Sequence, residues 1–231
     1  MVPLGRKAYG RNTMRQLAPF AVALLLVTCG GAAPRAELTA TPGASASPTV
    51  NVVATPMPTY APTAEGFASK VLIEKPRDIS TSATGYIWVL AGTPTDGRGV
   101  SAAVSDKESY TASYQAPRQT GAEKVAYATP DLPPLAVGPY TEGLRLVTVQ
   151  AGGRSAAHMH SGIEGVLVLE GRVLIRSGGN APTFLDAGQG FYILPKVPIQ
   201  LINAGTSVAR TLVYSISPVG APFSTELATS P

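Results

Sequence analysis

Two histidines and one glutamate are grouped in a short part of the chain, at a spacing that suits metal chemistry. His158 and His160 are the only histidines in the sequence, and Glu164 follows four residues after the second. Side chains alternate faces along a β-strand, so His158 and His160 point to the same side if this segment is extended. Glu164 keeps that parity if the chain stays roughly extended through Ser161 and Gly162. Two imidazoles and a carboxylate would then converge on one divalent metal ion, with iron, manganese, nickel and zinc as candidates.

The elements expected to position these residues are short strands. The chain of 231 residues contains 24 Gly and 21 Pro, and only 14% of its residues are charged. This composition favours strands joined by tight turns over long helices, and therefore an all-β fold. Residues 138–217 contain about eight strand-like segments with turn signals at regular intervals, which is typical of a small antiparallel β-barrel or jelly roll.

The segment Gly152–Gly171 resembles the first conserved motif of the cupins. It matches at both flanking glycines and at His158, His160 and Glu164. The resemblance implies the cupin barrel, a small antiparallel β-barrel or jelly roll. It also implies that these three residues hold a divalent metal together with one further histidine from a second motif. Cupins include dioxygenases, isomerases, decarboxylases, sugar-binding modules and storage proteins, so the resemblance does not fix a function.

Residues 188–203 resemble the second cupin motif but lack its metal ligand. Two prolines and Asn203 fit the motif, whereas Ile199 stands where the family has its fourth ligand, a histidine. Lys196 also stands where a glycine is expected. Isoleucine cannot coordinate a metal, so any metal here would be held by the two histidines and the glutamate alone, as in two-His-one-carboxylate iron sites.

Two functions remain open on these residues. In the first, the protein binds a small molecule in its barrel over a divalent metal, and any enzymatic activity would be oxygen-dependent oxidation, as in cupin dioxygenases. In the second, it is a non-catalytic ligand-binding, sensing or assembly module. His158 and His160 would then line a pocket without metal, and Glu164 would pair with one of them or with Arg154. The resemblance also implies a possible homodimer.

The net charge of +4 does not indicate a nucleic-acid partner. Four basic residues lie within the first fifteen positions, and from Cys29 onward the chain holds 14 basic and 14 acidic residues. The sequence has no basic stripe interleaved with aromatic residues, so we expect no nucleic-acid binding.

Residues 1–29 are typical of an export signal. Residues 17–28 form an apolar run that is shorter than the about 20 residues of a membrane-spanning helix. Cys29, the only cysteine, follows directly. Leu26–Gly30 resembles the lipobox of bacterial lipoproteins, with Thr28 where a smaller residue is usual. We expect an extracytoplasmic protein anchored to the cell membrane by a lipid on Cys29; a plain secreted protein and an uncleaved anchor are the alternatives.

The rest of the chain divides by composition. Residues 30–64 are rich in Pro, Thr, Ala and Ser and have almost no charge, which predicts a disordered linker. Residues 65–137 contain several short strand signals, either an extension of the barrel or a degenerate, metal-free copy of the cupin unit. Residues 138–217 are the expected barrel, and residues 218–231 are expected to be a loose tail.

Overall fold

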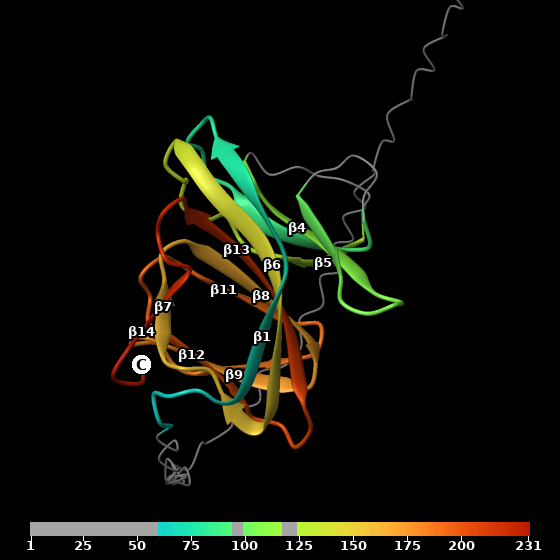
Figure 1. Cartoon of the computed structure of the whole chain (residues 1–231), viewed down its shortest axis with the longest axis vertical. Coiled ribbons are helices and arrows are strands. Elements are labelled where there is room, and N and C mark those ends of the chain that lie inside the picture. Colours follow the sequence, from blue (N-terminus) through green and yellow to red (C-terminus); the bar gives the residue numbers. More distant parts are fainter. Residues whose placement is uncertain (1–59, 94–98, 117–123) are drawn as a thin grey trace, which may run out of the picture. The chain divides into compact units, whose positions relative to one another are not determined.

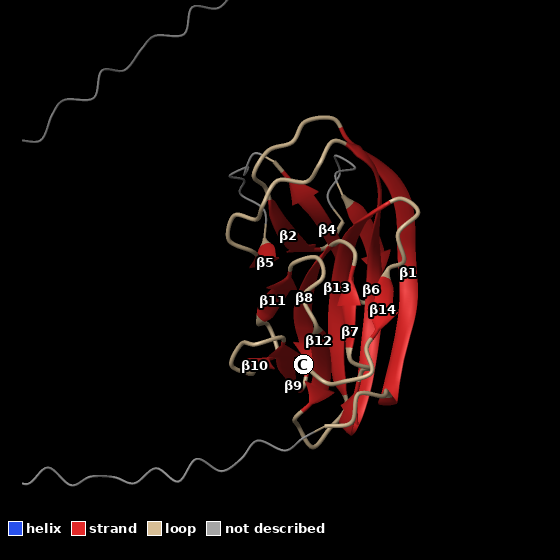
Figure 2. Cartoon of the chain, turned by 90° about the vertical axis from the view of Figure 1, so that its left-hand side faces the viewer, coloured by secondary structure: helices blue, strands red, loops and turns tan. Residues whose placement is uncertain are grey.

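The computed structural model describes residues 60–93, 99–116 and 124–231 (Figure 1). The signal segment, Cys29 and most of the predicted linker lie outside these residues. Every regular element in the described part of the chain is a β-strand (Figure 2). Among these residues, no helix has the length and apolar character needed to cross a membrane.

Ten strands form one antiparallel sheet that curls into a nearly closed barrel (Figure 1). The main order is β10-β9-β12-β6-β13-β8-β11, while β1 pairs with β6, and β7 pairs with β12 and β14. The bounds are β1 (Glu65–Ile79), β6 (Gly138–Arg154), β7 (His158–His160), β8 (Ile163–Glu170), β9 (Arg172–Ser177), β10 (Thr183–Asp186), β11 (Gly190–Ile193), β12 (Ile199–Asn203), β13 (Ala209–Pro218) and β14 (Ser224–Glu226). The predicted all-β barrel is therefore confirmed.

Alternation along the strands separates the inside of the barrel from its outer face. On β6, Val147 and Val149 belong to one apolar cluster, whereas Leu144 belongs to another. On β8, Val166 and Val168 join the first cluster and Leu167 joins the second. The first cluster lines the inside of the barrel, and its many valines and isoleucines suit the pleated surface of a strand.

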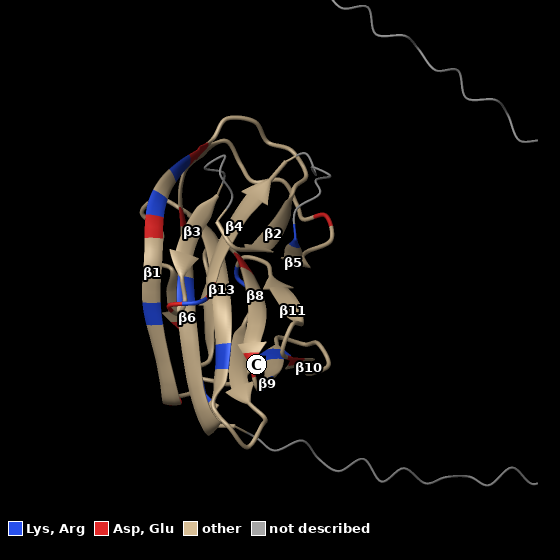
Figure 3. Cartoon of the chain, turned by 90° about the vertical axis from the view of Figure 1, so that its right-hand side faces the viewer, with Lys and Arg blue, Asp and Glu red and all other residues tan. Residues whose placement is uncertain are grey.

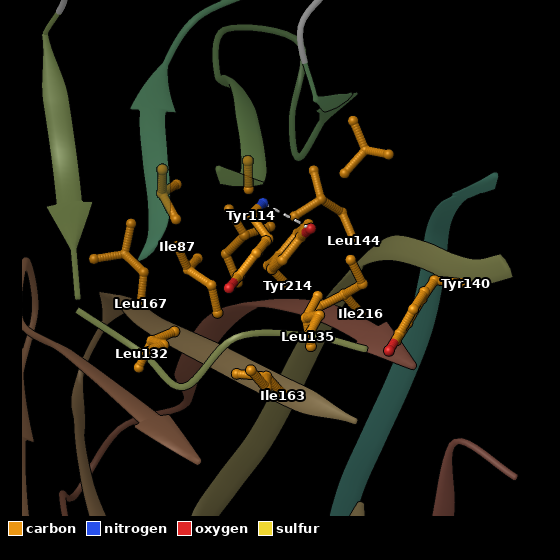
Figure 4. Packing of buried hydrophobic residues seen from close by; sticks show 14 of the residues in the cluster. Ile87, Tyr114, Leu132, Leu135, Tyr140, Leu144, Ile163, Leu167, Tyr214 and Ile216 are labelled. Atoms are coloured by element: carbon orange, nitrogen blue, oxygen red, sulfur yellow. Dashed lines mark hydrogen bonds between the residues drawn. The ribbon is translucent and has the colours of Figure 1, made fainter. Parts of the chain in front are cut away.

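A second sheet of four strands covers the outer face of the barrel. Its order is β3-β4-β2-β5, with β2 (Tyr86–Ala91), β3 (Val100–Ala103), β4 (Ser109–Gln115) and β5 (Val125–Ala128). Figure 4 shows Ile87 and Tyr114 of this sheet packed with Leu167 and Tyr214 of the barrel. The described residues of the segment 65–137 thus do not close into a second barrel: β1 extends the first one and β2 to β5 cover it.

The first strand, β1, forms an edge of the barrel sheet. Its fifteen residues pair with β6 along nearly their whole length. Lysine, arginine and acidic residues are spread along it (Figure 3). Charged side chains on an edge strand oppose pairing with the edge of another sheet.

The two ends of the described domain are tied to the barrel. The structure differs here from the predicted loose tail, because β14 pairs with β7 and Leu227 N donates to Ala157 O at 2.8 Å. At the other end, Pro62 O accepts a hydrogen bond of 2.6 Å from Ala157 N. Both terminal segments therefore bond to the backbone of Ala157, the residue directly before His158.

A buried polar network joins the two sheets. The Tyr214 hydroxyl donates to Glu142 Oε2 at 2.9 Å and accepts from Tyr114 N at 2.9 Å. Arg77 donates to the same Glu142 oxygen at 2.9 Å and to Tyr114 O at 2.7 Å. Tyr214 and Glu142 are almost completely buried, so each of these bonds satisfies a group that water does not reach.

Replacing Tyr214 by phenylalanine is expected to destabilise the protein by about 1–3 kcal/mol, because it leaves the buried Tyr114 N–H unsatisfied and removes one donor from Glu142. Chemical denaturation measures the change in the free energy of unfolding. Tyr140→Phe is the matched control, since the Tyr140 hydroxyl donates to a single carbonyl, Ala136 O, at 3.1 Å. Equal losses in the two variants would contradict a special role for the network.

Candidate functional site

The three candidate residues come from two strands that follow one another in the chain but do not pair with each other. His158 and His160 are the first and last residues of β7, which pairs with β12 on one side and β14 on the other. Glu164 lies on β8, opposite Ser215 of β13. Gly162 makes the turn between β7 and β8 possible, because a Cβ at this position would lie 2.0 Å from Ile216 O.

The side chains of these residues line one cavity of about 270 Å³ inside the barrel. The rest of the lining is largely apolar, with Val147, Val166 and Val213 prominent. His160 and Glu164 are 3% and 6% exposed. A small, mostly apolar cavity with a few polar groups gathered on one side is the usual form of a small-molecule site.

The polar groups meet at close distances. His158 Nε2 lies 3.0 Å from His160 Nε2, and His160 Nε2 lies 3.0 Å from Glu164 Oε2. The two imidazole rings are nearly perpendicular, at 89°. The three residues predicted from the sequence therefore lie close together, and their role as metal ligands stays a prediction. Of the pairings considered for Glu164 without metal, the one with a histidine is observed, whereas Arg154 pairs with Glu65.

The other nitrogen of each imidazole faces a backbone carbonyl. His158 Nδ1 lies 2.7 Å from Ala156 O, and His160 Nδ1 lies 3.0 Å from Phe223 O. A carbonyl oxygen only accepts, so each Nδ1 must carry the proton. In the neutral rings both Nε2 atoms then present lone pairs to one another. This is also how proteins orient histidines that bind a metal through Nε2.

Burial shifts the protonation of all three groups. Desolvation is the main cause that lowers the pKa of His158 and His160 below the ordinary value, so both rings stay neutral at neutral pH. Desolvation also raises the pKa of Glu164 to about 7, while His158 and Arg145 oppose this shift. Near neutral pH a protonated Glu164 can donate to His160 Nε2, but the contact between the two histidine nitrogens still has no proton.

The distances can be compared with metal coordination. Ligand atoms at about 2.1 Å from a metal and at right angles to one another are separated by about 3.0 Å. The contacts from His158 to His160 and from His160 to Glu164 both have this length. As the side chains stand in the described residues, however, no three or more His, Cys, Asp or Glu residues form a complete group able to hold a metal ion.

The residue that replaces the family's fourth ligand lies in the same cavity. Ile199 of β12 pairs with His158 of β7 and lines the cavity, with 2% of its surface exposed. The neighbouring Gln200 points away from the cavity, and its amide donates to Ala61 O and Ser155 O. Ile199 therefore presents an apolar side chain to the cavity, where the family has a metal ligand.

Two parts of the site were missed in the sequence. Arg145 lines the cavity from β6, on the same face as Val147. A charged residue within a mostly apolar strand was the available signal, but it becomes informative only once the inward face of the strand is known. Phe223, Ser224 and Glu226 also line the cavity, from the segment expected to be a loose tail. The Phe223 ring centroid lies 4.7 Å from that of His160.

Comparisons with known proteins support the cupin assignment of the barrel. Residues 145–215 match the family described as "Cupin domain". This is the part that carries β6 to β13, and it agrees with the resemblance of the two motifs. No protein of curated function matches the sequence.

Several solved structures are similar to part of the chain. A cupin-like protein of Thermotoga maritima has 20% identity over 38% of this chain and 65% of its own, with a TM-score of 0.35. An oxalate oxidase in complex with the substrate analogue glycolate has 23% identity over 33% and 42%, with a TM-score of 0.32. The polyketide cyclase RemF of Streptomyces resistomycificus has 20% identity over 37% and 60%, with a TM-score of 0.33. The chain spans less than two thirds of each of these structures. At such TM-scores these similarities indicate neither the function nor the ligand of this chain.

Proposed function

We propose that the protein binds a small molecule inside its barrel over a divalent metal ion held by His158, His160 and Glu164. The observation that carries this proposal is the contact of 3.0 Å between the two Nε2 atoms. Both Nδ1 atoms are committed to carbonyl oxygens, so this contact sets two lone pairs against each other. A cation between them removes the repulsion, and the adjacent carboxylate of Glu164 supplies the negative charge that a metal ion favours.

The chain's own residues define what such a site would do. Three protein ligands leave coordination positions open to a small molecule, and a bound iron or manganese ion would supply Lewis-acid and oxygen chemistry there. The apolar lining restricts water, and the cavity of about 270 Å³ restricts the ligand to a small one. If the protein is an enzyme, we therefore propose oxidation with oxygen as its reaction class.

A specific observation favours a second function, that of a non-catalytic binding or sensing module. Ile199 packs beside His158, at the position where a fourth ligand would complete the family's metal site. A site with three ligands binds metal less tightly than one with four, and the barrel could bind its ligand through the two histidines and Glu164 alone.

We also propose the setting in which the site works. The apolar run of residues 17–28 directly before the only cysteine supports an export signal with a lipid on Cys29, hence an extracytoplasmic protein at the membrane. A homodimer remains part of the proposal through the family resemblance alone.

Titration of the metal-free protein with Zn²⁺, Mn²⁺, Ni²⁺ and anaerobic Fe²⁺, followed by calorimetry, tests the metal site. We expect one ion per chain for at least one of these metals. The absence of binding by all four would leave the non-catalytic module as the better description.

Metal affinity is expected to depend on pH in a defined direction. The raised pKa of Glu164, about 7, means that below this pH the folded protein carries a proton that the metal must displace. Metal affinity should therefore fall by about tenfold for each pH unit below 7. Above pH 7 Glu164 is already deprotonated, so it should add no further pH dependence. Repeating the titration from pH 5.5 to 8 with Glu164→Gln as control measures the effect. A slope that is unchanged in the variant would contradict the assignment to Glu164.

A further inference from the structure

Arg145 is a cation placed inside the barrel. It lies on β6, and its side chain lines the same cavity as the two histidines and Glu164. The side chain is only 17% exposed. A buried cation is costly unless its charge and its donors are balanced. The partners of Arg145 therefore indicate what else the cavity must hold.

Two partners hold the guanidinium of Arg145 in place, and one of its N–H donors has no hydrogen-bond acceptor. Arg145 Nη2 forms an ion pair with Glu74, whose own side chain is 44% exposed at the surface. On its other side the guanidinium lies 4.2 Å from the centroid of the Phe223 ring. Its Nε is buried and has no hydrogen-bond partner among the described residues. The side chain is thus oriented, with one unsatisfied donor that a ligand oxygen could satisfy.

The charges that line the cavity do not cancel once a divalent ion is bound. The ion contributes two positive charges, Glu164 removes one and Arg145 adds one. Glu74 balances Arg145 through their ion pair, and Glu226 borders the cavity but is exposed, so water screens it. One positive charge therefore remains. An excess of positive charge in an apolar enclosure favours a negatively charged ligand.

We propose that the ligand is a small carboxylate, whose charged end lies between the three metal-ligating groups and Arg145 and whose apolar body contacts the valines of the barrel. This inference rests on the proposed metal site. A carboxylate suits both partners, because its oxygens would be ligands for a divalent ion and acceptors for a guanidinium. The volume of about 270 Å³ limits the apolar body to a short chain.

Binding of butyrate to the zinc-loaded protein, compared with uncharged butyramide, tests the proposal. We expect butyrate to bind at least about tenfold more tightly than butyramide, and Arg145→Gln to remove this preference. Arg145→Lys should recover it only in part, since lysine keeps the charge but lacks the planar fork. Zinc affinity is measured on every sample and should change little in Arg145→Gln.

Glu74→Gln is a second variant, and it is expected to raise butyrate affinity where Arg145→Gln lowers it. It removes the carboxylate that competes for Arg145 from outside the cavity, so butyrate affinity should increase a few-fold. Equal binding of butyrate and butyramide in zinc-loaded wild-type protein would overturn the inference and leave the metal site intact. If zinc does not bind, whichever of Mn²⁺, Ni²⁺ and anaerobic Fe²⁺ binds takes its place; if none binds, the proposed metal site fails. Butyrate binding to the metal-free protein then decides the inference: loss in Arg145→Gln supports it, and an absence of binding overturns it.

Discussion

Replacing His160 by alanine is expected to lower metal affinity by at least about 100-fold, more than the loss of a group that only orients a ligand. His160 is the residue that touches both other candidate ligands, at 3.0 Å from His158 Nε2 and 3.0 Å from Glu164 Oε2. Its removal therefore breaks both close contacts of the group at once. Competition with a chromophoric chelator measures the affinity over the required range.

The metal-free form of the same variant should behave differently. Phe223 O loses its donor, but the two facing lone pairs no longer repel, so the free energy of unfolding should stay within about 2 kcal/mol of the wild type. Ser69→Ala is the control, because Ser69 lines the same cavity without belonging to the group of three. Unchanged metal affinity in His160→Ala, with the control also unchanged, would remove the metal site from the proposed function.

Replacing Ile199 by histidine is expected to raise metal affinity, by about 10- to 100-fold. Ile199 lines the cavity and pairs directly with His158 across β12 and β7, so a histidine at this position can approach the other three groups. The same competition assay measures the gain.

This gain should be accompanied by a loss of stability without metal. A buried imidazole in place of isoleucine adds polar groups that lack partners, which costs about 1–3 kcal/mol in the metal-free protein. Ile199→Val is the control, since it keeps the position apolar and adds no ligand. A variant Ile199→His that is destabilised both with and without metal, and that binds metal no better, would show that this position does not face the group of three.

The sequence predicted the centre of the site well because the information there is local. His158 and His160 are two residues apart on one strand, so alternation places both on one side, and Glu164 reaches the same cavity through the turn at Gly162. Ile199 was assigned to the same pocket from its place in the second motif, and the structure confirms this.

The outer parts of the site could not be predicted because they depend on pairing between distant segments. Phe223 reaches His160 across 63 positions, through a strand of only three residues with no apolar alternation. Arg145 is recognisable as an inward-facing cation only after β6 has been paired with β1 and β13. The position of the covering sheet, β2 to β5, was also not predictable. Its residues showed the composition of short strands, but nothing in the sequence indicated against which face they would pack.

The separation of 63 positions between His160 and Phe223 has a consequence for how the site is assembled. Ribosomes deliver a protein from its N-terminus, so the histidines emerge well before the carbonyl that fixes the proton of His160 on Nδ1. Under the proposed function, a nascent or truncated chain that stops before β14 holds all three candidate ligands but lacks the carbonyl that orients one of them. Full-affinity metal capture can then follow only the synthesis of Phe223. The ion that the protein acquires is set by the metal supply where β14 pairs with β7, and not where the histidines are translated.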